Sequence, residues 1–126
     1  IVWGSSYSAA LAYRLAVAHP ERVAGIATFS PAAGGPMESC RPRRWLDGLR
    51  VPAIAFRPDR EMELDSSREQ RALLEAAGVE FVVVAHGVHG SSMLVDDRTA
   101  ADMRAARARV TAWLEAVAGV KAGGSH

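Results

Sequence analysis

A serine within a run of small residues is the first candidate for chemistry in this chain. Ser6 is the centre of the pentapeptide Gly4-Ser5-Ser6-Tyr7-Ser8, which lies between apolar residues 1–3 and an alanine-rich stretch. This pattern predicts a strand, a sharp turn and a helix, with the Ser6 hydroxyl at the apex of the turn. The N–H groups and positive dipole end of the helix would then stabilise an oxyanion beside Ser6. The alternative is that Ser6 only caps the helix.

Carboxylates and histidines follow two later apolar segments. Four acidic residues lie between positions 59 and 65, after the apolar segment 52–57, and His86 and His89 follow the apolar segment 79–85. A serine hydroxyl becomes a nucleophile when a histidine accepts its proton and a carboxylate orients that histidine. The chain therefore contains the three residue types that nucleophilic catalysis by serine requires.

The elements that must position these residues can be predicted from the alternation of apolar and helix-forming segments. We expect strands over residues 1–4, 23–30, 52–57 and 79–85. We expect helices over residues 8–19, 65–77 and 97–117, and a weak helix and turn over 38–49. Such alternation predicts an α/β protein, with a parallel sheet, right-handed crossovers and helices on both faces. Loops at the carboxyl ends of parallel strands lie at one edge of the sheet, so the serine, the acids and the histidines should meet there.

Several residues mark the expected helix ends. His19 precedes Pro20 and should end the first helix, because a residue before proline avoids the helical region. Asp65 and Ser66 with Glu69 form a capping box that should start the second long helix, and Gly78 should end it as a left-handed glycine. The first strand lacks alternation, which is typical of a strand covered on both faces.

Composition limits the classes of function. The 126 residues suit one domain, which we place at residues 1–118 with a flexible tail at 119–126. A net charge of +1 gives no reason to expect nucleic acid as a partner, and no apolar run reaches the ~20 residues of a membrane span. The single cysteine, Cys40, has no companions at zinc spacing. We therefore expect no metal, and the absence of nucleotide-binding fingerprints predicts no cofactor.

Four stretches together resemble one protein family. They are Gly4-Ser5-Ser6-Tyr7-Ser8, Ala18-His19-Pro20-Glu21-Arg22-Val23 leading into Gly25-Ile26, Val51-Pro52-Ala53-Ile54, and Gly87-Val88-His89-Gly90. The chain resembles the C-terminal half of an α/β-hydrolase of the dienelactone-hydrolase and esterase type. The first stretch is similar to the nucleophile elbow G-x-S-x-G of that fold, with Ser8 in place of the last glycine. The chain also opens inside a strand and without Met, so we expect further strands upstream.

The resemblance implies a role for each candidate residue. Ser6 would be the nucleophile, His89 the base, and the backbone N–H of Tyr7 one oxyanion donor. In this family the acid lies about nine residues after the proline that opens its strand. Counting from Pro52 leads to Glu61, with Asp59 as the runner-up. Glu63 and Asp65 are weaker candidates, Asp65 being better suited to capping a helix, and His86 is a competitor of His89.

The implied function is a serine hydrolase that cleaves an ester or related acyl bond of a small molecule through an acyl-enzyme. Two alternatives stay open: a non-catalytic binding domain of the same fold, and a peptidase or carbon–carbon hydrolase with the same triad. The family's second oxyanion donor comes from an upstream loop, and losing one donor costs about 10²–10³ in rate. The first strand would also have a bare edge. We therefore expect this segment alone to be weakly active or inactive, and we expect pairing of this edge with another chain or with the missing N-terminal half.

Overall fold

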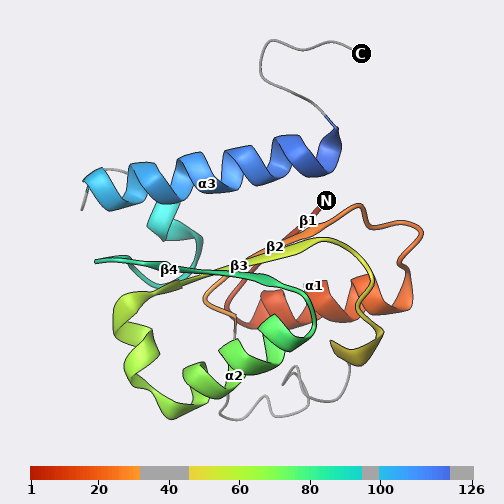
Figure 1. Cartoon of the computed structure of the whole chain (residues 1–126), viewed down its shortest axis with the longest axis horizontal. Helices are drawn as coiled ribbons and strands as arrows, with labels where there is room; N and C mark the ends of the chain where they lie inside the picture. The colour runs from red at the N-terminus through yellow and green to blue at the C-terminus, as the bar shows by residue number, and fades with distance from the viewer. Residues whose placement is uncertain (32–45, 95–99, 120–126) are drawn as a thin grey trace.

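The computed structural model contains one sheet of four parallel strands (Figure 1). The structure describes residues 1–31, 46–94 and 100–119. The strands are β1 (Val2–Ser5), β2 (Ile26–Phe29), β3 (Ala53–Pro58) and β4 (Glu80–Val84), and they lie in this order across the sheet. The predicted α/β class and parallel sheet are therefore confirmed.

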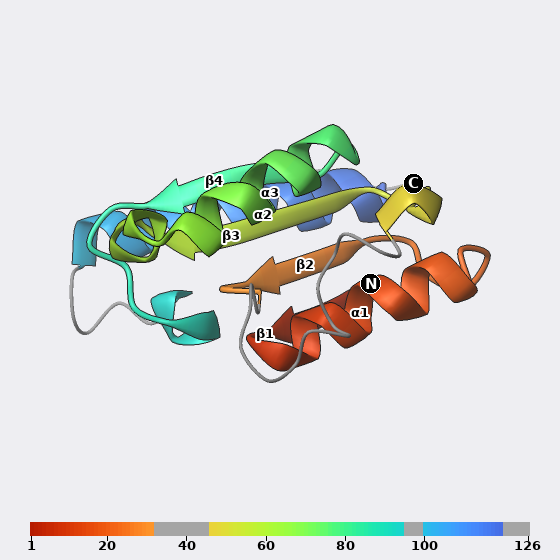
Figure 2. The same ribbon diagram turned by 90° about the horizontal axis from the view of Figure 1, so that it is seen from below.

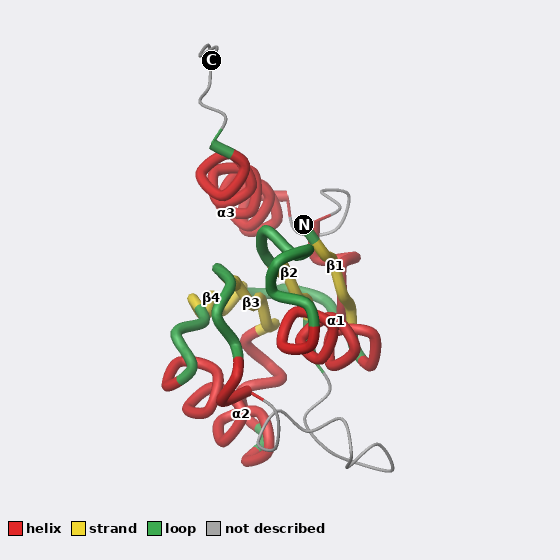
Figure 3. The backbone as a smooth tube through the Cα atoms, turned by 90° about the vertical axis from the view of Figure 1, so that its right-hand side faces the viewer, coloured by secondary structure: helices red, strands yellow, loops and turns green. Residues whose placement is uncertain are grey.

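Helices cover both faces of the sheet. They are α1 (Tyr7–Ala18), α2 (Asp65–Ala76) and α3 (Ala100–Ala118), with short 3₁₀ helices η3 (Leu46–Gly48), η4 (Asp59–Glu63) and η5 (Gly90–Leu94). Figures 2 and 3 show α1 and α2 on one face and α3 on the other, as the alternation of elements predicted. In the described ranges, no helix combines the length and the apolar character that crossing a membrane requires.

The register of the sheet aligns the carboxyl ends of its strands. Ser5 pairs with Phe29, Phe29 with Phe56, and Pro58 with Val84. Because every strand runs in the same direction, the residues that follow β1, β2, β3 and β4 come out at one edge of the sheet. This edge is where the candidate residues for chemistry lie.

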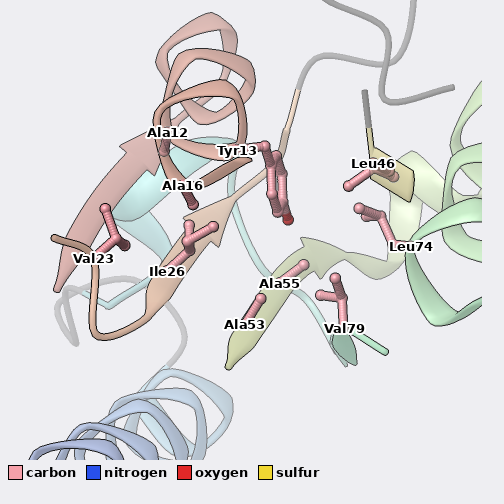
Figure 4. Packing of buried hydrophobic residues seen from close by; sticks show 10 residues of the cluster. All are labelled: Ala12, Tyr13, Ala16, Val23, Ile26, Leu46, Ala53, Ala55, Leu74 and Val79. Atoms are coloured by element: carbon pink, nitrogen blue, oxygen red, sulfur yellow. The ribbon is translucent and has the colours of Figure 1, made fainter. Parts of the chain in front are cut away.

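Apolar side chains fill the layer on each face of the sheet. Figure 4 shows the cluster between the sheet and α1, α2 and η3, in which the small Ala12 and Ala16 let α1 pack closely. On the other face, α3 contributes Val110 and Trp113 to a second cluster. There Phe29 and Phe56 stack with their ring centroids 5.2 Å apart. The strands β2, β3 and β4 are thus packed against helices on both faces.

Helix ends agree with the sequence at two places and differ at a third. The N–H of His19 donates to the carbonyl of Leu15 where α1 ends, and Gly78 has a φ of 85° after α2, as predicted. The predicted capping box is wrong. The N-cap of α2 is Leu64, which has no capping side chain. The α-helix begins directly after η4 and Leu64, and the backbone carbonyl of Leu64 accepts the N–H groups of Ser67 at 3.1 Å and Arg68 at 3.2 Å.

Some expected features lie outside the described residues. They are residues 38–45 of the expected weak helix, Cys40, residues 97–99 of the last expected helix, and residues 120–126 of the tail.

The expectation that the first strand is covered on both faces is wrong. β1 is an edge strand, and Ile1 and Trp3 are 49% and 45% exposed. The cluster beneath α3 contains buried residues of β2, β3 and β4 but none of β1. Trp3 of β1 contacts Phe29 of this cluster, with ring centroids 4.4 Å apart. In the described residues, β1 thus has the open edge that the sequence predicted, and its Trp3 side chain is left partly exposed by the helices on both faces.

A buried tyrosine gives the fold a pH dependence that can be tested. The hydroxyl groups of Tyr13 and Thr28 are hydrogen-bonded at 2.8 Å, and complete burial raises the pKa of Tyr13 well above its ordinary value of 10.0. Above that ordinary value the unfolded chain binds fewer protons than the folded one, so stability that is fully present below pH 10 is lost as pH rises. We expect a loss of up to about 1.4 kcal/mol per pH unit.

Urea unfolding between about pH 9 and about pH 11 measures this dependence. The Tyr13→Phe variant lacks the titrating group and should lose the corresponding part of the slope. A slope that is the same in both proteins would contradict the role of Tyr13.

Candidate active site

Ser6 alone connects the first strand to the first helix. β1 ends at Ser5 and α1 begins at Tyr7, so the chain reverses within one residue. Ser6 has φ 55° and ψ −121°, a backbone conformation that costs a non-glycine residue about 1–3 kcal/mol. Ser6 is the N-cap residue of α1, yet its side chain makes no capping hydrogen bond. The alternative that Ser6 is only a helix cap is therefore not supported.

Small residues on both sides of Ser6 allow this turn. A Cβ on Gly4 would lie 2.6 Å from the Cα of Ala9 and 2.9 Å from the carbonyl oxygen of Ser8, so strand and helix touch there. Ser8, which replaces the last glycine of the elbow pattern, closes the turn. Its hydroxyl donates to the carbonyl of Ser5 at 2.7 Å and accepts the Ser5 N–H at 2.8 Å.

Replacing Gly4 by alanine tests whether this close approach sets the position of Ser6. The added methyl group would overlap backbone atoms, which cannot move aside as a flexible side chain can, so a loss of about 1–3 kcal/mol is expected. Gly78→Ala is the matched control. It is destabilised by a similar amount through its positive φ alone, because no atom lies within 4 Å of its added Cβ. Thermal unfolding should place both variants below the wild type.

Only the Gly4→Ala variant should also lose labelling of Ser6 by a fluorophosphonate. Equal labelling of the two variants would contradict the link between Gly4 and the turn.

The start of α1 is suited to binding negative charge. Tyr7 is the first helical residue, so its N–H is one of the donors for which a helix has no internal acceptor. The first turn of α1 contains no acidic residue that would offset the positive end of the helix dipole. The predicted oxyanion donor is thus located next to Ser6 at a positive helix end.

The structure brings the predicted acid and base together. Nδ1 of His89 lies 2.7 Å from Oε2 of Glu61, which belongs to η4 at the end of β3. The Glu61 side chain is 15% exposed and that of His89 60% exposed. With Nδ1 engaged by the carboxylate, Nε2 is the ring nitrogen left for proton transfer. This pair has the geometry of a base oriented by an acid.

The loop that carries His89 is attached beside Ser6. The N–H of Ser91 donates to Oγ of Ser5 at 3.2 Å, and a Cβ on Gly90 would lie 2.6 Å from the same oxygen. The neighbours of His89 therefore contact the neighbour of Ser6. Across the described chain, no hydrogen bond joins Ser6 to His89. Such bonds are often long until substrate binds.

The other carboxylates of the acidic run have different partners. The backbone N–H groups of His86 and Arg60 donate to the Asp59 carboxylate. These hydrogen bonds, and that of His86 most strongly, hold the pKa of Asp59 below its ordinary value. Asp65 forms an ion pair with Arg68. Glu61 is thus the member of the run within hydrogen-bond distance of His89, while Asp59, the runner-up, is engaged by the loop that contains His86.

Two residues that contact Glu61 were missed by the sequence analysis. Nη1 of Arg57 lies 2.5 Å from Oε1 of Glu61, and Oγ of Ser30 lies 3.4 Å from Oε2. Ser30 also accepts the N–H of Gly90 at 2.9 Å. Burial lowers the pKa of Arg57 below its ordinary value, and the Glu61 carboxylate acts in the opposite direction. Both residues could have been noticed as polar groups at the carboxyl ends of apolar strands.

The geometry of the described residues is the evidence for the function of this site. Within the described part of the chain, no group of three or more His, Cys, Asp or Glu side chains could hold a metal ion. Comparisons with protein-family models, with curated proteins and with solved structures find no match. The chain is thus an α/β protein with a serine on a strained turn and an acid–histidine pair beside it, and its function must be inferred from this geometry.

Proposed function

We propose that the protein is a serine hydrolase of the α/β-hydrolase type, that this chain corresponds to the C-terminal half of that fold, and that it cleaves an ester or related acyl bond. The observation that carries the proposal is the backbone of Ser6, with φ 55° in the single residue between β1 and α1. Backbone strain of this kind persists only where the surrounding structure maintains it, and it is concentrated at functional sites. The strand–turn–helix geometry is the one in which a nucleophilic serine is exposed at the top of a sheet.

The proposed reaction uses three side chains and one backbone group. Oγ of Ser6 attacks the acyl carbon while Nε2 of His89 takes its proton, and the N–H of Tyr7 donates to the developing oxyanion. Glu61 holds the Nδ1–H of His89 and stabilises the imidazolium. His89 then returns the proton to the departing alcohol, which leaves an acyl-enzyme on Ser6. Water, deprotonated by His89, releases the acid and restores the serine.

Labelling with a fluorophosphonate tests the proposal directly. The reagent phosphonylates an activated serine, and mass spectrometry of the digested protein should find the adduct on the peptide that contains Ser6. A folded protein that is not labelled, or that is labelled at another serine, would refute the assignment.

A binding domain without catalysis is the second candidate. The observation that favours it is that Ser6 and His89 are not hydrogen-bonded within the described residues. A protein that binds acyl compounds but is not labelled at Ser6 would support this alternative.

We also propose that the edge of β1 pairs with a second copy of the chain. Among the described residues, β1 has a neighbouring strand on one side only, and its Trp3 side chain is exposed. The adjacent helix α1 exposes Tyr7, Leu11 and Leu15 by 47%, 58% and 45%. Their spacing of four residues places them on one stripe. An open strand edge beside exposed apolar side chains is a site for pairing with another chain.

Sedimentation velocity should therefore detect dimers or larger species. The double variant Trp3→Lys/Leu11→Lys should shift the protein to monomer, because charges beside an open edge prevent pairing. Leu64→Lys is the matched control. Leu64 is 58% exposed but precedes α2 rather than lining β1 or α1, so this change should leave the distribution as it is. A monodisperse wild-type monomer would contradict the proposal.

A further inference from the structure

A charged side chain lies in a strand that is buried along its whole length. Arg57 belongs to β3, all six residues of which are buried, and it is 3% exposed. A buried charge is unfavourable unless it is paired and hydrogen-bonded. The partners of Arg57 therefore indicate its role.

The guanidinium of Arg57 is held by two groups on one side. Its Nη2 donates to Oε1 of Gln70 on α2 at 2.6 Å and to the carbonyl oxygen of Pro31. Nε2 of Gln70 donates to the same carbonyl at 3.3 Å. These contacts fix the guanidinium plane against α2 and against the chain that follows β2.

On its other side the guanidinium fixes one oxygen of a carboxylate. Nη1 of Arg57 donates to Oε1 of Glu61 at 2.5 Å, while Oε2 of Glu61 lies 2.7 Å from Nδ1 of His89 and 3.4 Å from Oγ of Ser30. The two oxygens of Glu61 thus have separate partners. A carboxylate held at Oε1 can rotate little, so Oε2 is presented to His89 in one orientation.

We propose that Arg57 is a positioning residue, whose guanidinium selects Glu61 among the neighbouring carboxylates and orients it toward His89. The kinetic consequence rests on the proposed hydrolase function, whereas the structural consequence does not. Arginine suits this role because its planar fork binds Glu61 and Gln70 in fixed directions, which the point charge of lysine cannot do. Because Arg57 also offsets the charge of Glu61, its contribution is orientation and not additional negative charge beside His89.

The test combines a kinetic with a structural measurement on the full chain. The inactivation rate constant and the binding constant of a fluorophosphonate are determined separately for the wild type, Arg57→Met and Arg57→Lys. In the same proteins, NMR detects the Nδ1–H proton of His89, which hydrogen bonding to Glu61 protects from exchange with solvent.

In Arg57→Met we expect the inactivation rate to fall about 10- to 100-fold, because small misplacements of a catalytic group have effects of this size. Binding of the reagent should be unchanged, and the Nδ1–H signal should be lost to exchange. Arg57→Lys should be intermediate. Arg109→Met is the matched control, because it removes the same type of side chain from an exposed ion pair with Glu80. It should keep both the rate and the signal.

Each outcome decides between the claims. A wild-type rate with an unchanged Nδ1–H signal in Arg57→Met overturns the inference. Loss of the signal in a protein whose wild type is never labelled supports the positioning role and removes the hydrolase proposal. If Arg57→Met does not fold, Arg57→Lys decides on the same two measurements, and wild-type behaviour of that variant overturns the inference.

Discussion

Replacing Ser6 by alanine should abolish labelling by a fluorophosphonate and remove any esterase activity of the protein. A nucleophile that forms a covalent intermediate has no substitute within the site, and its loss costs about 10⁶ in turnover in enzymes of this mechanism. The fold should tolerate the change, because the Ser6 side chain makes no capping hydrogen bond with α1. Thermal unfolding should therefore be close to that of the wild type, while labelling falls below detection.

Two further variants make this prediction specific. Ser92→Ala changes an exposed serine of η5 and should be labelled like the wild type. His89→Ala should lose labelling almost as completely as Ser6→Ala, because in the proposed mechanism the two residues act as a unit, whereas His19→Ala at the far end of α1 should keep it. Labelling that persists in Ser6→Ala would show that another residue is the nucleophile.

Replacing Glu61 by alanine should reduce both activity and stability. Glu61 is the carboxylate partner of the buried Arg57, whose side chain is 4% exposed. Removing one member of a buried ion pair leaves an uncompensated charge and typically costs about 3–5 kcal/mol. For a domain of this size we expect the unfolding temperature to fall by about 10–20 °C. Labelling should fall as well, because His89 loses the acceptor of its Nδ1–H.

Asp59→Ala is the matched control for this prediction. Asp59 lies two residues before Glu61 and is half-buried, and its partners are backbone N–H groups, those of Arg60 and His86, in place of a buried guanidinium. The variant should unfold near the wild-type temperature and be labelled at a similar rate. If Asp59→Ala loses labelling and Glu61→Ala does not, the roles of the two carboxylates must be exchanged.

The strand and helix order could be predicted from the sequence because it depends on local patterns. Apolar segments alternate with helix formers, and His19 and Gly78 mark helix ends through backbone preferences of single residues. The start of α2 could not be predicted in the same way. Ser66 and Glu69 have the spacing of a capping box, but η4 leads into the helix through Leu64, so that the N-cap position is taken by a residue whose side chain cannot cap. A 3₁₀ turn of this kind has no clear sequence signal.

The three main residues of the candidate site could be predicted from the sequence, but the contacts that hold them in place could not. The positions of Ser6, Glu61 and His89 after three strands follow from parallel topology. Counting from Pro52 leads to Glu61 and not to Asp59, but the contact of Glu61 with Arg57 was missed, because Arg57 lies in a strand whose pattern otherwise looks purely structural. Contacts between residues that are distant in sequence, such as that of Gly90 with Ser30, depend on how the loops pack. No local pattern encodes such contacts.

The arrangement of the strands has a consequence for how the protein is made. Each strand lies beside the one that precedes it in the chain, from β1 to β4, so a growing polypeptide can add one strand at a time to the sheet already formed. The serine would emerge from the ribosome first, the carboxylate next, and His89 after β4. The candidate site would therefore be assembled only after β4 has been synthesised and has joined the sheet.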